Sequence, residues 1–181
     1  MKWTKIETTH QLSFLPNIFP VNCYIVEEET ELTLIDCALP YSHKAILQAA
    51  QKIRKPITRI VITHAHSDHI GSLDRLKESL PEVQVFISKR DAKLLCGDRS
   101  SIEGEDNIPV RGAVPAPDSV KTKPDHLVEE GDKIGSLQVL WTPGHTPGSI
   151  SLLDNRNKHI IVGDALQTRG GIAISGDMRP L

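Results

Sequence analysis

The chain has 181 residues, of which 39% are hydrophobic and 24% are charged, and its formal net charge at pH 7 is -2. This length allows one compact domain over 1–181 and is too short for two comfortable domains. The charge excludes a strongly basic nucleic-acid surface, and the lack of about 18 consecutive apolar residues excludes a membrane span. Because no apolar signal core follows Met1 and the three cysteines are widely spaced, we expect a cytoplasmic protein with reduced thiols.

The first half of the chain mixes strand and helix patterns. Two apolar runs around a polar turn predict a hairpin, and apolar residues at helical spacing, ended by Pro56 and Pro81, predict two helices. Ser88 is a suitable N-cap for a third, shorter helix. In chain order we predict strands at 21–26 and 32–37, a helix at 45–53, a strand at 57–62, a helix at 70–80, a strand at 83–87 and a helix at 88–96.

The middle of the chain, 97–123, has neither a helical nor a strand period and is rich in glycine and proline. A structureless segment of this length inside a domain is usually functional or mobile. We expect an irregular loop here. It is either a lid or substrate-binding insert, or a disordered segment without a function. After it the pattern turns to short strands between Gly, Asp and Asn turns, and we predict strands at 126–129, 135–141, 149–153 and 158–162.

A cluster of ligand-type side chains follows the predicted strand at 57–62. Within six residues it holds His64, His66, Asp68 and His69, so that three of the eight histidines of the chain lie together. His64 and His66 are two residues apart on extended chain, so they share a face and can clamp one ion. Neutral imidazoles with a carboxylate are the usual donors for zinc, or for iron or manganese. The cluster therefore predicts a metal site at the end of a buried strand.

Two later segments end strands in the same way. Thr142-Pro143-Gly144-His145-Thr146-Pro147-Gly148-Ser149 places a histidine in a stiff turn after a strand, and Ile160-Ile161-Val162-Gly163-Asp164 places a carboxylate after another. Ligands at strand ends are held by a rigid sheet while they face a cleft. Read alone, Gly144-His145 could be just a turn and Gly163-Asp164 just a strand end, so each is only a candidate for the same site.

Together, H-x-H-x-D-H at 64–69, T-P-G-H-T-P-G-S at 142–149 and V-G-D-A-L at 162–166 resemble the metallo-β-lactamase superfamily in order, spacing and strand context. The resemblance implies an α/β fold, the αββα sandwich of that family. It also implies that His64, His66 and His145 bind one ion, that Asp68 and His69 bind a second, and that Asp164 bridges the two. The cofactor is then two divalent metal ions, Zn²⁺ first and iron or manganese as alternatives. For Asp68 it further implies a catalytic part in orienting a hydroxide or accepting its proton.

Other residues near these motifs have supporting parts by the same resemblance. Asp36 matches a carboxylate that supports the ligands, although Cys37-Ala38 follows it here instead of the commoner Thr-Gly. Thr63 and Thr142 are either hydroxyls that support the ligands or ordinary strand-end threonines. Outside every motif are four histidines that we expect on the surface or in packing roles: His10, His43, His126 and His159.

Members of this family continue beyond the strand that carries the bridging carboxylate and add a final histidine, whereas no histidine follows Asp164 here. We therefore expect a sandwich truncated in its C-terminal portion, whether as a fragment or as a natural truncation. The second metal position would then lack one protein ligand. The later sheet would also leave an apolar face uncovered, which predicts a homodimer that covers it.

The resemblance makes hydrolysis the expected chemistry: a hydroxide held by the metal attacks a small ester, thioester or lactone. The expected partner is a small-molecule substrate, with neither nucleic acid nor membrane. One alternative is a mononuclear-iron sulfur dioxygenase that uses His64, His66 and His145. Another is a metal-binding but inactive truncated remnant.

Overall fold

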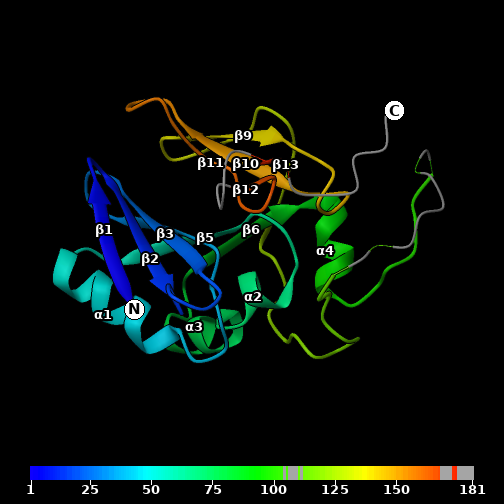
Figure 1. The fold of residues 1–181 in the computed structure, drawn as a ribbon, viewed down its shortest axis with the longest axis horizontal. Coiled ribbons are helices and arrows are strands. Elements are labelled where there is room, and N and C mark those ends of the chain that lie inside the picture. Colours follow the sequence, from blue (N-terminus) through cyan, green and yellow to red (C-terminus); the bar gives the residue numbers. More distant parts are fainter. Residues whose placement is uncertain (104, 106–109, 111, 168–172, 175–181) are drawn as a thin grey trace.

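The structure is a computed structural model that describes residues 1–103, 105, 110, 112–167 and 173–174. Two sheets lie face to face, and helices cover the outer face of the larger one (Figure 1). The larger sheet has the order β1 (Lys2–Ile6), β2 (Thr9–Phe14), β3 (Val21–Glu27), β4 (Leu32–Ile35), β5 (Ile57–Ile62), β6 (Gln84–Ser88) and β7 (His126–Val128). Strands β1 to β4 are antiparallel, and β4 to β7 are parallel.

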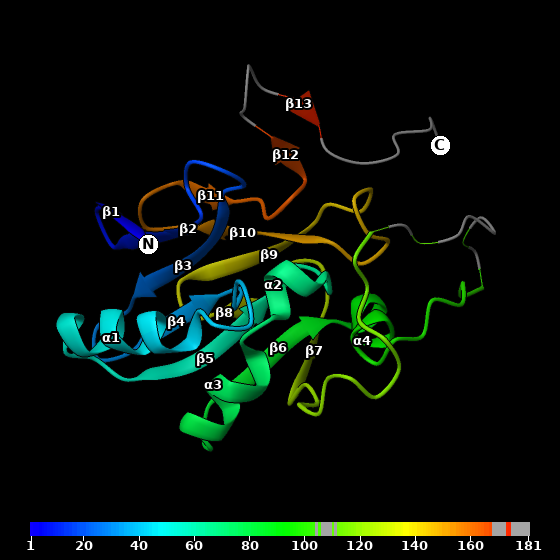
Figure 2. The ribbon, with the colours of Figure 1, turned by 60° about the horizontal axis from the view of Figure 1, so that its bottom comes forward.

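The described helices are α1 (His43–Ile53), α2 (Ser67–Ile70), α3 (Leu73–Ser79) and α4 (Lys89–Leu95). Figure 2 shows α1 and α3 on one side of the larger sheet and the smaller sheet on the other. The smaller sheet is antiparallel, in the order β11 (His159–Ile161), β10 (Ile150–Asp154), β9 (Leu137–Trp141) and β8 (Lys133–Ile134). A separate pair joins β12 (Leu166–Gln167) to β13 (Ala173–Ile174).

Two hydrophobic clusters hold these layers together. Because successive strand residues point to opposite faces, Leu34 and Ile60 pack under the helices, whereas Ile35 and Val61 face the smaller sheet. Buried side chains of the smaller sheet pack against Ile35 and Val61: Leu137, Val139, Ile150, Leu152 and Ile161. The larger sheet is therefore buried on both faces where its strands are parallel.

Three of the four layers of the expected αββα sandwich are thus present in the described part of the chain. Within that part no helix packs on the outer face of the smaller sheet, where Ile160 is 50% exposed (Figure 1). The homodimer expected from such a face stays a prediction. None of the described helices is long and apolar enough to cross a membrane.

Most predicted elements agree with the structure to within two residues, and one differs in kind. The helix predicted at 70–80 is interrupted between α2 and α3. There the His69 carbonyl accepts a hydrogen bond from the Cys37 backbone N–H. A Cβ at Gly71 would lie 2.6 Å from the Ala38 carbonyl oxygen. The strand predicted at 135–141 begins only at Leu137. Gly135, with a φ of +59°, makes a tight turn back to β8.

The N-terminal strands β1 and β2 were not predicted, because β1 is mostly exposed and carries no alternating apolar pattern. The N-cap prediction is confirmed: the Ser88 Oγ accepts a hydrogen bond of 3.1 Å from the backbone N–H of Asp91.

Between α4 and β7 the described residues form no helix or strand, as predicted for 97–123. This loop is tied down at both ends. Arg90 on α4 pairs with Glu105, and Asp74 on α3 accepts hydrogen bonds from the backbone N–H groups of Lys121 and Thr122. Whether the loop acts as a lid stays a prediction.

Candidate metal centre

The centre lies where several strands end at one edge of the larger sheet. Strands β4 and β5 are parallel, so their carboxyl ends, Asp36 and Thr63, meet at that edge. The loop after β5 carries His64 and His66, and α2 then places His69 one turn further on. The Thr63 carbonyl accepts a hydrogen bond of 3.0 Å from the backbone N–H of Ile150, which joins the second sheet to this edge.

The side chains predicted from the motifs form two donor groups that share His64. The first group is His64, His66 and His145, and the second is His64, His69 and Asp164; within each, the ligand atoms lie within 4.8 Å of one another. The Nδ1 of His66 lies 2.9 Å from the Nε2 of His145, although 79 positions separate them in the sequence. Because the imidazole of His64 offers one lone pair, it can bind an ion in only one of the two sets, and a second ion would depend on the other donors of its set.

His64 carries the strongest sign that these groups fit a metal. It is 1% exposed, and its Nε2 has no hydrogen-bond partner in the described part of the structure. Burial, followed by the neighbouring imidazoles, holds the pKa of His64 well below its usual range. A neutral imidazole with a free lone pair is the form that coordinates a cation, so the residues present fit a divalent metal ion.

Asp36 contacts His69 on the side of the ring that faces away from the centre. This buried carboxylate accepts a hydrogen bond of 2.8 Å from the Thr63 backbone N–H and another of 2.8 Å from the Thr63 hydroxyl, and it lies 2.8 Å from the Nδ1 of His69. A φ of +60° at Asp36 turns the chain at the end of β4 and aims the side chain this way. The Nε2 of His69 is thereby left facing the centre.

Asp164 lies between the two groups. Its Oδ1 is 3.3 Å from the Nε2 of His69, and its Oδ2 is 3.5 Å from the Nε2 of His145. Burial opposes the charge on His69, but Asp36 and Asp164 outweigh it and raise the pKa of His69 to about 10. A metal ion would take the place of that proton, because ligating imidazoles are neutral.

Asp68 lies at the margin of the centre. Its Oδ2 is 3.8 Å from the Nε2 of His69, its side chain is partly exposed, and it belongs to neither of the two donor groups found among the described residues. Its predicted parts as a ligand and as a catalytic residue stay predictions.

The two threonines differ. The Thr63 hydroxyl contacts Asp36 and lies 3.1 Å from the Nδ1 of His64, so it supports both donor groups. The Thr142 hydroxyl instead lies 2.9 Å from the Ser151 hydroxyl, away from the ligands.

Sequence reasoning missed Asp91, which is buried beneath the centre. It lies in the first turn of α4 and accepts hydrogen bonds from Ala65, Thr146 and Gly148. In the sequence an acidic residue in a first helical turn is ordinary, so no local signal separated it from other such residues.

Described residues of the loop at 97–123 contact the segment that carries His66. The Ala113 carbonyl accepts a hydrogen bond of 2.9 Å from the backbone N–H of Ser67, and Gly112, with a φ of +90°, lies directly against the His66 ring. A Cβ at position 112 would overlap the His66 ring. Part of this loop therefore forms a wall of the centre.

Of the histidines outside the motifs, His10 is the most buried, at 3% exposure. The Trp3 Nε1 donates a hydrogen bond of 3.0 Å to its Nδ1, and its Nε2 lies 2.7 Å from Glu27. Glu27 also binds Lys5 and Lys55. Burial alone would raise the pKa of Glu27, but hydrogen bonds from Lys5, His10 and Lys55 outweigh it and lower the pKa to about 2.

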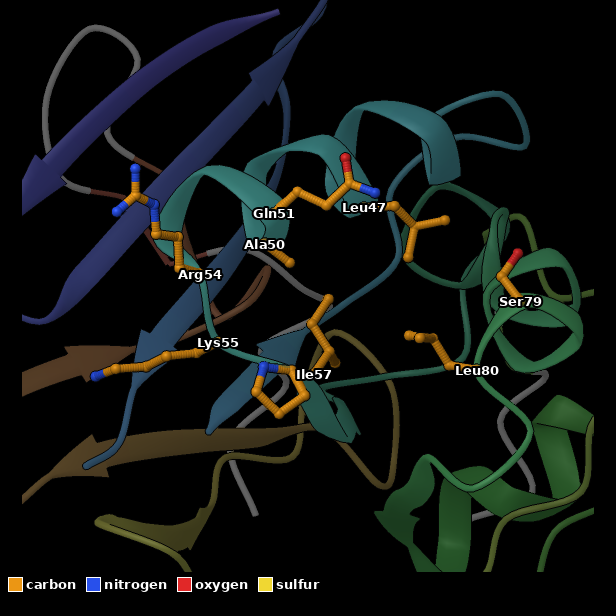
Figure 3. A pocket seen from close by; sticks show the side chains of 9 residues that line it. Leu47, Ala50, Gln51, Arg54, Lys55, Ile57, Ser79 and Leu80 are labelled. Atoms are coloured by element: carbon orange, nitrogen blue, oxygen red, sulfur yellow. The ribbon is translucent and has the colours of Figure 1, made fainter. Parts of the chain in front are cut away.

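One hollow lies away from the centre. It has a volume of about 420 Å³ and opens between α1 and the end of α3, where Leu47, Gln51 and Arg54 face Ser79 and Leu80 (Figure 3). None of the donor residues lines it.

Comparisons with known proteins agree with this geometry. The family model described as the metallo-beta-lactamase superfamily matches residues 16–181. The chain is 52% identical to the uncharacterized protein YobT of Bacillus subtilis, over 99% of this chain and 76% of that protein. It is 31% identical to the probable metallo-hydrolase YqgX of the same species, over 83% of this chain and 68% of that protein. It is 26% identical to a hydroxyacylglutathione hydrolase of Gloeobacter violaceus, over 89% of this chain and 54% of that protein.

Solved structures give the same fold. A di-iron-bound form of TTHA1623 matches with a TM-score of 0.66 and 28% identity, over 90% of this chain and 74% of that chain. The subclass B3 metallo-beta-lactamase BJP-1 of Bradyrhizobium japonicum matches with a TM-score of 0.59 and 29% identity, over 81% of this chain. The chain spans 53% of the length of BJP-1.

Proposed function

Because the chain belongs to the metallo-beta-lactamase superfamily, we propose that it is a metal-dependent hydrolase of a small ester, thioester or lactone. The observation that carries this proposal is the pair of donor groups that share His64, with the two oxygens of Asp164 turned toward different groups. A superfamily match together with this arrangement supports hydrolysis more directly than a binding role. The reason is that two ions, with Asp164 between them, can activate water and stabilise an attacked carbonyl.

The substrate class is supported by the relatives. Several carry the name probable metallo-hydrolase, and the Gloeobacter relative is named for hydrolysis of an acylated glutathione. Acyl esters, thioesters and lactones share one reacting group, a carbonyl that gains negative charge when it is attacked. Neither the net charge of -2 nor any motif in the chain favours a nucleic-acid substrate.

Each residue has a distinct proposed part. His64, His66 and His145 hold one ion, and His69 and Asp164 hold the second, with Asp164 shared and Asp68 completing the second set. Bound divalent metal lowers the pKa of water and stabilises charge on an attacked carbonyl oxygen. Asp36 fixes the ring of His69 through its Nδ1, so that the Nε2 is presented to the centre. Asp68, partly exposed beside His69, is placed to accept a proton at its carboxylate.

We propose Zn²⁺ as the metal, since a donor set rich in histidine suits zinc. Iron is the second candidate, because TTHA1623, which shares this fold, has been solved in a di-iron-bound form.

The test is reconstitution of the metal-free chain with Zn²⁺, Fe²⁺ or Mn²⁺, followed by assays on panels of esters, thioesters and lactones. We expect turnover near pH 7 that needs metal, that falls to background in His66→Ala and that persists in the control His126→Ala. His126 suits this control because it is exposed, stacks on Phe86 and belongs to neither donor group. Metal binding without hydrolysis of any panel member would contradict the proposal. Oxygen uptake with glutathione persulfide in the iron form would identify a sulfur dioxygenase instead.

A further inference from the structure

Asp91 joins two loops that come from distant parts of the chain. Its Oδ2 accepts a hydrogen bond of 2.8 Å from the backbone N–H of Ala65 and one of 2.9 Å from the Thr146 hydroxyl. Its Oδ1 accepts a hydrogen bond of 2.9 Å from the backbone N–H of Gly148. The side chain is fully buried, at 0% exposure. All three donors thus converge on one carboxylate that solvent does not reach.

Each of these donors lies in a loop that carries a candidate ligand. Ala65 lies between His64 and His66, and Thr146 directly follows His145. The first donor group therefore draws its three imidazoles from the two loops that Asp91 connects. A shift in either loop would change the separation of the His66 Nδ1 from the His145 Nε2, which is 2.9 Å.

The N-terminus of α4 adds a second connection to the same loop. The Ser88 hydroxyl donates a hydrogen bond of 2.6 Å to the Gly148 carbonyl while it caps the helix at Asp91. Gly148 fits there because it has no side chain: a Cβ would lie 2.5 Å from the Asp91 Oδ1 and 2.6 Å from the Ser88 Oγ. The contact between helix and loop is thus too close for any other residue.

We infer that Asp91 is a positioning residue that fixes the loops of His64–His66 and His145 against each other, so that the three imidazoles are arranged for one metal ion before it binds. This inference rests on the proposed function, because it assumes that these histidines bind metal. Asp91 itself touches no candidate ligand atom among its described contacts; it acts through backbone groups and one hydroxyl on the two loops.

Three variants change this connection in graded steps. Asp91→Ala removes all three acceptor contacts. Asp91→Asn keeps the shape but turns an amide N–H₂ donor toward groups that are themselves donors. Thr146→Val removes one hydroxyl donor and keeps both backbone contacts.

A matched control exists on α3. Asp74 also accepts hydrogen bonds from two backbone N–H groups and a hydroxyl, those of Lys121 and Thr122. It ties down the end of a loop but contacts neither ligand-bearing segment in the described structure. Asp74→Ala therefore removes a comparable set of bonds without touching the centre.

The experiment measures Co²⁺ binding to the metal-free chain, by competition with a chelator and by the visible spectrum of the bound ion. We expect Asp91→Ala to weaken Co²⁺ binding by about 10- to 100-fold, the range found when groups behind metal ligands are removed. The Co²⁺ affinity of Asp91→Asn should lie between those of Asp91→Ala and wild type. Thr146→Val should lose the least affinity, and the spectrum of its bound Co²⁺ should be altered. Asp74→Ala should keep wild-type affinity and spectrum.

A second readout needs no metal. In the metal-free chain, the amide protons of Ala65 and Gly148 should exchange with solvent faster in Asp91→Asn than in wild type. Faster exchange that is uniform over the whole chain would indicate general destabilisation and would overturn the positioning role.

Wild-type affinity and spectrum in Asp91→Ala overturn the inference. If Asp91→Ala does not fold, wild-type Co²⁺ affinity and spectrum in both Asp91→Asn and Thr146→Val overturn the inference. Absence of Co²⁺ binding by the wild-type chain defeats the proposed function and this inference together. Weakened binding in the variants, beside a wild type that binds Co²⁺ but hydrolyses nothing, supports the positioning role and defeats only the proposed hydrolysis.

Discussion

Two buried histidines, His10 and His64, have nearly the same exposure and opposite surroundings. Both ring nitrogens of His10 are paired, one with the Trp3 indole and the other with Glu27. The Nε2 of His64 is buried without a partner in the described structure and faces other imidazoles. A buried polar group without a partner destabilises a fold, so its presence needs a reason. Burial alone therefore does not separate these two histidines: among the described residues, His64 combines an unpaired ring nitrogen with neighbouring imidazoles, whereas the unpaired Nδ1 of His43 belongs to neither donor group.

The largest effect should come from replacing His64, which belongs to both donor groups. We expect His64→Leu to lose the first ion, since that group keeps only two imidazoles, and to weaken binding of the second through the altered packing against His69. At a metal concentration about 1,000 times the dissociation constant, the bound metal stabilises the fold by about 4 kcal/mol, and the variant should lack this gain. Thermal unfolding with and without Zn²⁺ measures it. In chelator the variant should be no less stable than wild type, and a marked loss there would place His64 with the structural histidines.

Asp164→Asn should weaken binding of the second ion most, because the first ion keeps its three imidazoles. The first donor group does not include Asp164, so the variant should keep one ion per chain while the second is bound more weakly. Metal analysis after dialysis, together with titration of the metal-free protein, gives the number of ions. Loss of both ions would show that the two groups do not bind independently.

Replacing His10 should lower the stability of the fold without changing its metal content, the opposite of what we expect for His64. His10→Leu leaves the Trp3 N–H and one oxygen of Glu27 without their ring partners, which should cost about 2 kcal/mol of unfolding free energy. The loss should be the same with and without Zn²⁺, and the metal content should not change. Denaturant unfolding under both conditions provides the measurement. A change in metal content would break the distinction between the two histidines.

The smallest effect is the pH dependence around Glu27. Because its pKa is lowered from 4.5 to about 2 in the fold, its contribution is present above pH 4.5 and is lost as the pH falls toward 2. The loss should be about 1 kcal/mol, the scale of an ion pair that keeps contact with water. Unfolding of the metal-free protein between pH 6 and pH 2.5 tests it. In Glu27→Gln this part of the pH dependence should disappear.

The sequence predicted much of the fold because its signals are local. Helical spacing, proline stops and the Ser88 cap each act within a few residues, and the resulting elements agree with the structure. The interruption between α2 and α3 could not be predicted in this way, because the chain there contacts the backbone of 37–40, and no local pattern reveals that contact.

The centre shows the same limit. His64, His66 and His69 are close in sequence, and the family resemblance supplied His145 and Asp164, so the structure brings together residues that were already named. Asp91 lies 26 positions from Ala65 and 55 from Thr146. Its part follows only from the fold, since a lone acidic residue in a helical turn carries no motif.

Gly112 has a consequence for how this protein can change over time. Loops that shape a substrate cleft are where new specificities arise, since they accept insertions more readily than strands do. Here the loop backbone lies against the His66 ring, in a space that admits no side chain. A larger residue at position 112 would displace a candidate ligand. A grafted loop would therefore have to bring its own glycine, so this loop and the donor residues are constrained together.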